Sequence, residues 1–146
     1  MPSKKDNILL VDDDARMLRM MQMILETEGY QVVLASNGED ALNTLVKGNI
    51  DLILLDIMMP GMDGIQLATR CLESDPDLAV IILADHSIVH PAIRALRLGV
   101  EDYLRKSAGS EALRRAIRQA LENLHEHPGT RRRGGWSSAR SWSPPS

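Results

Sequence analysis

The sequence predicts an α/β fold built on a doubly wound parallel sheet, and three observations predict it. Short apolar runs alternate five times with amphipathic stretches along the chain. The two middle runs, Leu52–Leu55 and Val80–Leu83, are apolar throughout, which is typical of strands buried on both faces. Alternation of strand and helix favours a single parallel sheet between two layers of helices.

Each element is expected from its own pattern. The apolar runs expected to be strands are Ile8–Val11, Val32–Ala35, Leu52–Leu55, Val80–Leu83 and Tyr103–Leu104. The stretches with helical spacing are Ala15–Glu28, Glu39–Lys47, Gly64–Glu73, His90–Leu98 and Glu111–Leu124. In the last of them, Leu113, Ile117, Leu121 and Leu124 share one face, so this helix should pack on the sheet.

Composition indicates one globular domain without a membrane segment. The chain has 146 residues, of which 44% are hydrophobic and 25% charged, with a net charge of −3. It contains no apolar run of the roughly 18 residues that a membrane span needs, and no signal peptide is evident, so we expect a cytoplasmic protein. Residues 1–125 carry 13 basic and 19 acidic residues, net −6, which argues against direct nucleic-acid binding by this part.

The last residues differ in composition from the rest. From Pro128 to the end, Gly, Pro and Ser make up 11 of 19 residues, and residues 126–146 hold four arginines against one glutamate. No apolar period survives there. We therefore expect a folded domain over residues 1–125 and a disordered basic Ser/Arg/Pro-rich tail or linker over residues 126–146.

Carboxylates follow several of the expected strands. Ligands of doubly wound sheets bind beyond the carboxyl ends of the strands, so side chains at those ends should meet. They are Asp12, Asp13 and Asp14 after the first strand, Asp56 after the third, Asp85 beyond the fourth and Lys106 at the fifth. Crowded carboxylates repel one another unless a cation lies among them, and an all-oxygen donor set favours Mg²⁺. The alternative for the first group is that the aspartates cap the helix beginning at Ala15, a role that we assign to Asp14.

The same groups suggest a reaction. A carboxylate beside a bound cation can attack phosphorus and form an aspartyl phosphate, while a lysine ammonium offsets charge on the transferring group. Asp56 and Lys106 fit these two roles. A metal-dependent phosphatase with an aspartate nucleophile would normally carry a second acid two residues further on, where this chain has Met58.

Three segments, ILLVDDD, DLILLDIMMPGMDG and GVEDYLRK, resemble the receiver domain of two-component response regulators. The resemblance covers about residues 6–125. It implies a flavodoxin-like fold with strand order 2-1-3-4-5. It also implies a role in signal transduction, in which the domain accepts a phosphoryl group from a phosphohistidine of a sensor histidine kinase or phosphotransfer protein. Such a domain is a phosphoacceptor that promotes its own phosphorylation and dephosphorylation, not an enzyme with a separate substrate.

The resemblance also implies a role for each site residue. Asp56 would be the phosphoacceptor and a Mg²⁺ ligand, Asp13 a direct Mg²⁺ ligand and Asp12 a ligand through water. The backbone carbonyl of Met58 would be another ligand, and Lys106 would bind a phosphoryl oxygen.

An output surface is implied as well. Tyr103 matches the aromatic residue that moves inward in this family when the site is phosphorylated. The surface formed by helix 90–98, strand 103–104 and helix 111–124 would then bind an output domain or a second copy of the chain.

Three positions depart from the family pattern. Ala84 stands where a threonine or serine hydroxyl normally bonds the phosphoryl group, and losing one such charge-assisted bond costs roughly 1.5–3 kcal/mol. Asp85 adds negative charge at the next position, and Ser107 replaces the usual proline after the lysine. His86 could lie near the phosphoryl group and modulate its hydrolysis. These departures motivate an alternative, a pseudo-receiver that binds a protein partner independently of phosphorylation.

Overall fold

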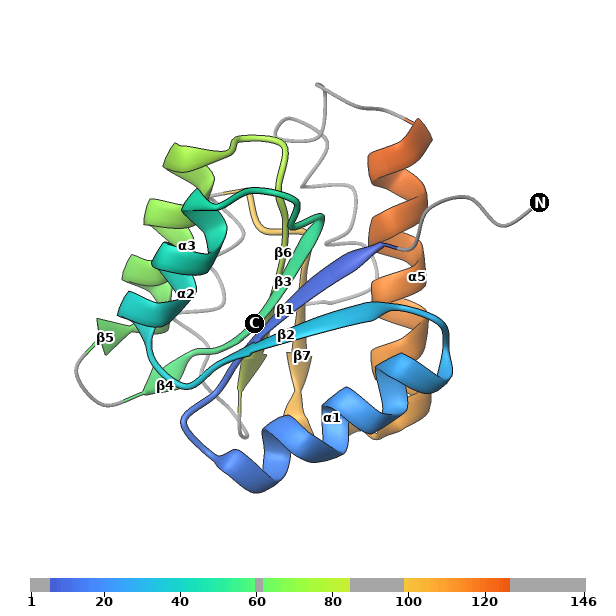
Figure 1. Cartoon of the computed structure of the whole chain (residues 1–146). Coiled ribbons are helices and arrows are strands. Elements are labelled where there is room, and N and C mark those ends of the chain that lie inside the picture. Colours follow the sequence, from blue (N-terminus) through green and yellow to red (C-terminus); the bar gives the residue numbers. More distant parts are fainter. Residues whose placement is uncertain (1–5, 60–61, 85–98, 127–146) are drawn as a thin grey trace, which may run out of the picture.

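A computed structural model describes residues 6–59, 62–84 and 99–126. Five parallel strands form one sheet in the order β2-β1-β3-β6-β7 (Figure 1). The strands are β1 (Asn7–Val11), β2 (Gln31–Ala35), β3 (Leu52–Asp56), β6 (Ala79–Ala84) and β7 (Asp102–Arg105). Counted along the chain, this is the order 2-1-3-4-5, so the predicted fold class and strand order are confirmed.

Helices cover both faces of the sheet (Figure 1). The described helices are α1 (Ala15–Thr27), α2 (Gly38–Val46), α3 (Gly64–Ser74) and α5 (Ser110–Glu126). Alternate residues of each central strand point to opposite faces. Leu9 and Ile53 therefore pack with α2 and α3, whereas Ile8 and Leu54 pack with α1 and α5. β3 and β6 are buried along their whole length, which explains their uninterrupted apolar sequences.

Three short elements were not expected from the sequence. After β3 the chain forms a small antiparallel ladder of β4 (Met58–Met59) with β5 (Met62–Asp63), and β5 leads directly into α3. After β7 a 3₁₀ turn, η1 (Lys106–Ala108), precedes α5. The predicted helix His90–Leu98, the residues Asp85 and His86, and the predicted tail after Glu126 lie outside the described residues, so those expectations stay predictions.

Polar contacts join α5 to the residues that precede β7 and β1. Asn123 Nδ2 donates a hydrogen bond to Glu101 Oε2 at 3.0 Å, and Glu101 is only 5% exposed. At the end of the helix, His125 Nε2 lies 3.0 Å from Oδ1 of Asp6, the residue before β1. None of the described helices has the length and apolar character needed to cross a membrane.

Candidate metal and phosphoryl site

The candidate site lies where β1 and β3 end side by side. Val11 is the register partner of Leu55, so the residues that follow, Asp12 and Asp56, are brought together at the carboxyl edge of the sheet. Both side chains are buried, with exposed fractions of 0% for Asp12 and 3% for Asp56, whereas Asp13 is exposed. The edge therefore carries two buried carboxylates and one that faces solvent.

The loop between β1 and α1 fixes the orientation of the Asp12 carboxylate. The backbone N–H of Asp14 donates to Asp12 Oδ1 at 3.0 Å, and the backbone N–H of Asp12 donates to the Ala35 carbonyl at 3.2 Å. Asp14 caps α1, because its Oδ1 accepts from the backbone N–H groups of Arg16 and Met17 at 3.0 and 3.4 Å. The capping role predicted for Asp14 is confirmed.

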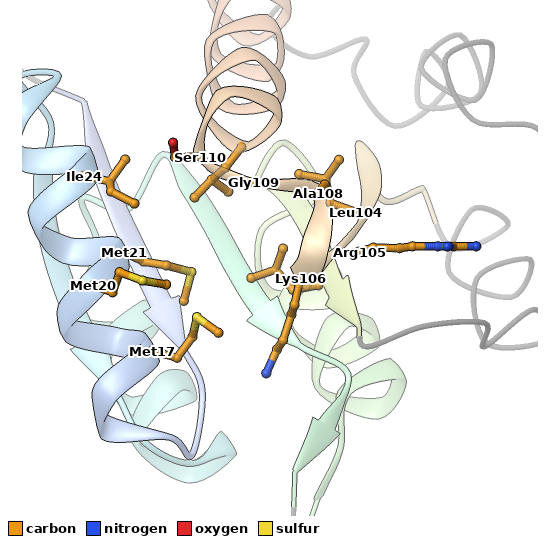
Figure 2. A pocket seen from close by; sticks show the side chains of 12 residues that line it. Met17, Met20, Met21, Ile24, Leu104, Arg105, Lys106, Ala108, Gly109 and Ser110 are labelled. Atoms are coloured by element: carbon orange, nitrogen blue, oxygen red, sulfur yellow. The ribbon is translucent and has the colours of Figure 1, made fainter.

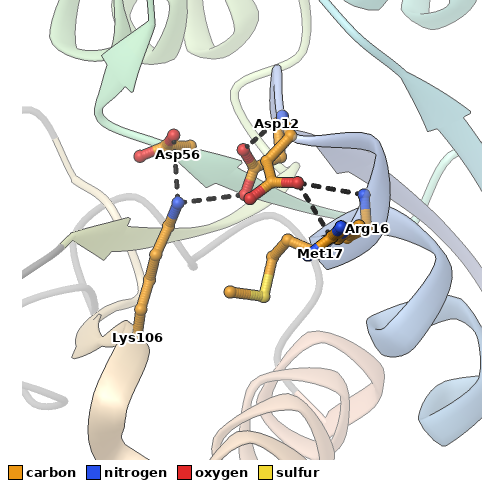
Figure 3. Close-up of polar contacts among 6 residues, drawn as sticks. Asp12, Arg16, Met17, Asp56 and Lys106 are labelled. Carbon is orange, nitrogen blue, oxygen red and sulfur yellow. Dashed lines mark hydrogen bonds and ion pairs between the residues drawn. The ribbon is translucent and has the colours of Figure 1, made fainter.

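Lys106, the first residue of η1, reaches the same point from just beyond the end of β7. Its Nζ lies 3.1 Å from Asp12 Oδ2 and 3.2 Å from Asp56 Oδ2, so one ammonium group bridges both buried carboxylates (Figure 3). The lysine side chain is only 15% exposed. Charge-assisted contacts of this kind are stronger when they are withdrawn from water, so the bridge orders all three side chains.

The ionisation of these groups reflects their burial and proximity. Burial raises the pKa of Asp12; the backbone N–H of Asp14 and the ammonium group of Lys106 counteract this only in part, while the nearby Asp56 adds to it. For Lys106, burial lowers the pKa, but the hydrogen bonds and charges of Asp12 and Asp56 outweigh it, so the pKa lies above its ordinary value. Lys106 therefore stays protonated at neutral pH.

The three aspartates fit a hard divalent cation. One carboxylate oxygen from each of Asp12, Asp13 and Asp56 lies within 4.8 Å of the other two. Asp12 Oδ2 is buried and, apart from the Lys106 ammonium group at 3.1 Å, has no partner among the described residues. A buried carboxylate oxygen with capacity left, in an all-oxygen donor set, is what Mg²⁺ binding requires.

The segment after Asp56 is held by backbone hydrogen bonds. The Ile57 N–H donates to the Leu83 carbonyl at 2.9 Å, and the Gly64 N–H donates to the Ile57 carbonyl at 3.0 Å. Between these two residues the chain forms the ladder of β4 and β5, which contains Met58. Ile57 is thus held through both its N–H and its carbonyl group, and this fixes the start of the backbone of Met58, the next residue.

A comparison with known families decides what this arrangement belongs to. Residues 8–118 match the family model described as the response regulator receiver domain. This chain belongs to that family. The resemblance inferred from the sequence is thereby confirmed: the chain is a receiver domain of the response-regulator type.

Curated relatives contain this receiver domain as one part of a longer protein. The transcriptional regulatory protein GlrR of Escherichia coli (strain K12) is 38% identical over 122 residues, which are 84% of this chain and 28% of GlrR. The uncharacterized transcriptional regulatory protein YkoG of Bacillus subtilis (strain 168) is 35% identical over 118 residues, which are 81% of this chain and 52% of YkoG. The chain thus spans about half or less of the length of these relatives.

Solved structures of similar receiver domains share the fold. One from Clostridium thermocellum has a TM-score of 0.79 at 30% identity and covers 83% of this chain and 98% of its own. The response regulator TrrA of Thermotoga maritima, solved in complex with Mg²⁺-BeF, has a TM-score of 0.73 at 31% identity, with coverages of 80% and 99%. A beryllofluoride-activated NtrC4 receiver domain dimer has a TM-score of 0.76 at 30% identity and covers 80% and 97%.

The two candidate switch residues of the receiver domain lie in one buried cluster. Ala84 ends β6, is fully buried, and has Arg105 as its register partner in β7. Tyr103 is 6% exposed and packs in the same cluster on the α2 and α3 side, and burial raises the pKa of its phenol. The tyrosine is thus already on the inside. The candidate modulators Asp85 and His86 lie outside the described residues.

An apolar groove of about 360 Å³ adjoins the receiver site (Figure 2). Met17, Met20 and Met21 of α1 line one side, and Lys106 and Leu113 approach from the side of η1 and α5. Met20 is 51% exposed, so the rim is accessible to a partner. Neither this groove nor the contact of Gly64 with the backbone of Ile57 was expected from the sequence. Only the helical spacing of the methionines gives a signal for the first, and no sequence pattern encodes the second.

Proposed function

We propose that this receiver domain accepts a phosphoryl group on Asp56 in a Mg²⁺-dependent reaction. The donor would be a phosphohistidine of a sensor histidine kinase or a phosphotransfer protein. The observation that carries the proposal is the Lys106 ammonium group, 3.2 Å from Asp56 and 3.1 Å from Asp12, beside three aspartates with cation-binding geometry. A solvated lysine at a strand end would make no such bridge.

The proposed transfer assigns one role to each residue. A carboxylate oxygen of Asp56 forms a bond to phosphorus as the bond between phosphorus and the donor histidine nitrogen breaks, and the histidine leaves with its electron pair and takes up a proton. Lys106 donates hydrogen bonds to a phosphoryl oxygen and keeps Asp56 oriented before the transfer. The domain would promote its own phosphorylation and dephosphorylation instead of turning over a separate substrate.

Asp12, Asp13 and Asp56 would hold the metal, with the backbone carbonyl of Met58 as a further ligand. When bound, Mg²⁺ supplies positive charge against the oxygens of the phosphoryl group. TrrA, which is similar over 80% of this chain, was solved with Mg²⁺-BeF, and this supports the choice of ion. The fit of the donor set supports it independently.

We propose two partner surfaces and a cytoplasmic location. The groove between α1 and α5 opens beside Lys106, so a donor protein seated there would bring its phosphohistidine to Asp56. The surface that includes β7 and α5 would bind an output domain or a second copy of the chain; the dimer formed by the NtrC4 receiver domain supports the latter. The domain would contact neither a membrane nor nucleic acid directly.

The deciding experiment measures intact mass after incubation with a small-molecule phosphodonor, with Mg²⁺ and with a chelator. We expect wild type to gain one phosphoryl group only with Mg²⁺, and Asp56→Asn to gain none, because an amide cannot act as the nucleophile. Asp77→Asn is the matched control, since Asp77 is an exposed aspartate in the turn before β6. Equal labelling of wild type and Asp56→Asn would contradict the proposal.

A second candidate function is a pseudo-receiver, whose partner binding does not depend on phosphate. The observation that favours it is the pair Ala84 and Tyr103: position 84 has no hydroxyl to bond a phosphoryl oxygen, and the tyrosine is already buried. On this hypothesis the domain occupies its binding conformation without modification.

The two functions predict different effects of phosphorylation on dimerisation, both in wild type and in Ala84→Thr. If phosphorylation still drives a switch weakly, the added hydroxyl should increase the phosphate-dependent change in dimerisation, measured by sedimentation. A pseudo-receiver should show no phosphate-dependent change in wild type, and its partner binding should be the same with and without the phosphodonor. A sharp rise in wild-type association on phosphorylation would exclude the second candidate.

A further inference from the structure

Gly64 begins α3 at the point where this helix meets the backbone that follows Asp56. A Cβ atom at position 64 would collide with the Cα atom of Ile57 and would lie 2.8 Å from the Asp56 carbonyl oxygen and 2.9 Å from the Ile57 carbonyl oxygen. All three are backbone atoms, so no side chain can rotate to make room. A side chain at position 64 therefore requires the backbone itself to move.

Packing and hydrogen bonds hold both partners of this contact, helix α3 and the backbone at Ile57, in place. On one side, α3 is anchored on the sheet by buried side chains that include Ile65, Leu67 and Cys71. On the other side, Ile57 is 3% exposed and is tied to β6 by its hydrogen bond to Leu83. Close-packed interiors transmit such strain instead of absorbing it, so a displacement would reach the residues next to Ile57.

We propose that Gly64 is a positioning residue for the metal and phosphoryl site, an inference that rests on the proposed function. Ile57 lies between two candidate Mg²⁺ ligands, the side chain of Asp56 and the backbone carbonyl of Met58. Gly64 contacts this residue directly and donates a hydrogen bond to its carbonyl at 3.0 Å. The absence of a side chain at position 64 thus sets where both ligands stand relative to Asp12 and Asp13.

Calorimetric titration of the unphosphorylated protein with Mg²⁺ tests the inference. We expect Gly64→Ala to bind Mg²⁺ about tenfold more weakly than wild type, the size of effect typical of residues that orient metal ligands. Gly48→Ala is the matched control: its φ of +87° makes alanine strained, but nothing lies within 4 Å of the added Cβ. Gly48 precedes β3, at the opposite end of the strand from Asp56. Both variants should lose stability, and only Gly64→Ala should lose Mg²⁺ affinity.

The outcomes separate this inference from the function on which it rests. Equal Mg²⁺ affinities of Gly64→Ala and Gly48→Ala would overturn the inference while leaving the proposed function in place. A wild-type protein that neither binds Mg²⁺ nor gains a phosphoryl group would overturn the proposed function first, and this inference with it.

A second measurement does not depend on whether the variant folds. In wild type, saturation with Mg²⁺ should shift the backbone amide resonances of Ile57 and Gly64, which adjoin the ligands, and leave that of Gly48 in place. An unchanged Gly64 resonance at saturating Mg²⁺ would overturn the inference.

Discussion

At the scale of single residues, Asp12 and Asp13 show how neighbours of the same type take different positions. Asp12 is fully buried and held by Asp14 and Lys106, whereas Asp13 is exposed. The buried carboxylate is therefore costly to the fold without a metal, because burial raises its pKa and favours the neutral form. Stability and metal binding make opposite demands on this residue.

Asp12→Asn should therefore stabilise the metal-free protein at neutral pH while weakening Mg²⁺ binding. The folded-state pKa of Asp12 is raised, so its ionised form is destabilising above that pKa, and an amide removes the cost. Urea unfolding in a chelating buffer measures the first effect, and calorimetric titration the second. The same substitution at the exposed Asp77 is the control, and a metal-free Asp12→Asn protein less stable than wild type would contradict the argument.

Asp102 should make stability depend on pH outside the site. Burial raises the pKa of Asp102 to about 6; the backbone N–H of Tyr103 lowers it in part and the neighbouring Glu101 raises it further. Its contribution to stability is fully present below the unfolded value of 3.8 and is lost as the pH rises through about 6.

Asp102→Asn should consequently be more stable than wild type at pH 7 by up to about 3 kcal/mol, and the difference should vanish below the unfolded pKa of 3.8. Chemical unfolding at a series of pH values measures it, with Asp77→Asn as the reference. A difference between Asp102→Asn and wild type that does not change with pH would show that the pKa of Asp102 is the same in the folded and unfolded states, and would contradict the prediction.

At the scale of elements, helix α2 begins at an identifiable cap. Asn37 has an extended backbone, and its Oδ1 accepts a hydrogen bond from the Asp40 N–H at 2.8 Å. Asn37→Ala should lower the free energy of unfolding by about 1 kcal/mol, because the first turn then has an unpaired N–H group. Asn37→Ser keeps an oxygen acceptor at the cap without placing a second carboxylate beside Asp40, and should stay close to wild type in urea unfolding. Equal losses in both variants would show that the cap is not the source of the effect.

The elements also show which structures a sequence can predict. All five strands were predicted in place, because continuous apolar runs such as Val80–Leu83 reflect burial on both faces, although the observed β6 extends by one residue at each end. Their spatial order followed from the resemblance to receiver domains, since apolar runs do not encode which strands are neighbours. The ladder of β4 and β5 was missed, since two-residue strands have no periodicity. Of the candidate site, Asp12, Asp13, Asp56 and Lys106 could be grouped in advance because parallel strands end at one edge.

Some features of the site could not be predicted because they depend on how helices and loops pack on the sheet. The difference in burial between Asp12 and Asp13 is set by how the loop after β1 packs beneath Lys106. The collision that any Cβ at position 64 would cause depends on where α3 docks, which is a property of the assembled sheet and helix. The functional roles of these residues remain predictions.

At the scale of the whole molecule, Mg²⁺ should act as a stabilising ligand. A metal that binds only the folded chain raises the free energy of unfolding by about 2.7 kcal/mol when its concentration is 100 times its dissociation constant. The thermal midpoint of wild type should therefore rise with Mg²⁺ concentration, and that of Asp13→Asn should rise less. Ca²⁺-free buffers kept at constant ionic strength with Na⁺ separate specific Mg²⁺ binding from general screening of the clustered carboxylates. A midpoint that follows ionic strength alone would contradict a specific site.

The contact between His125 and Asp6 places the start and the end of the described domain side by side. This domain could therefore be inserted into a surface loop of a host protein. Because its two ends lie close together, the insertion would leave the two halves of the host loop close together as well. For the same reason, a short peptide joining the two ends would permit new termini to be opened elsewhere, for instance in the exposed turn at Asp77. Such a permuted domain would keep its sheet order while its chain order changed.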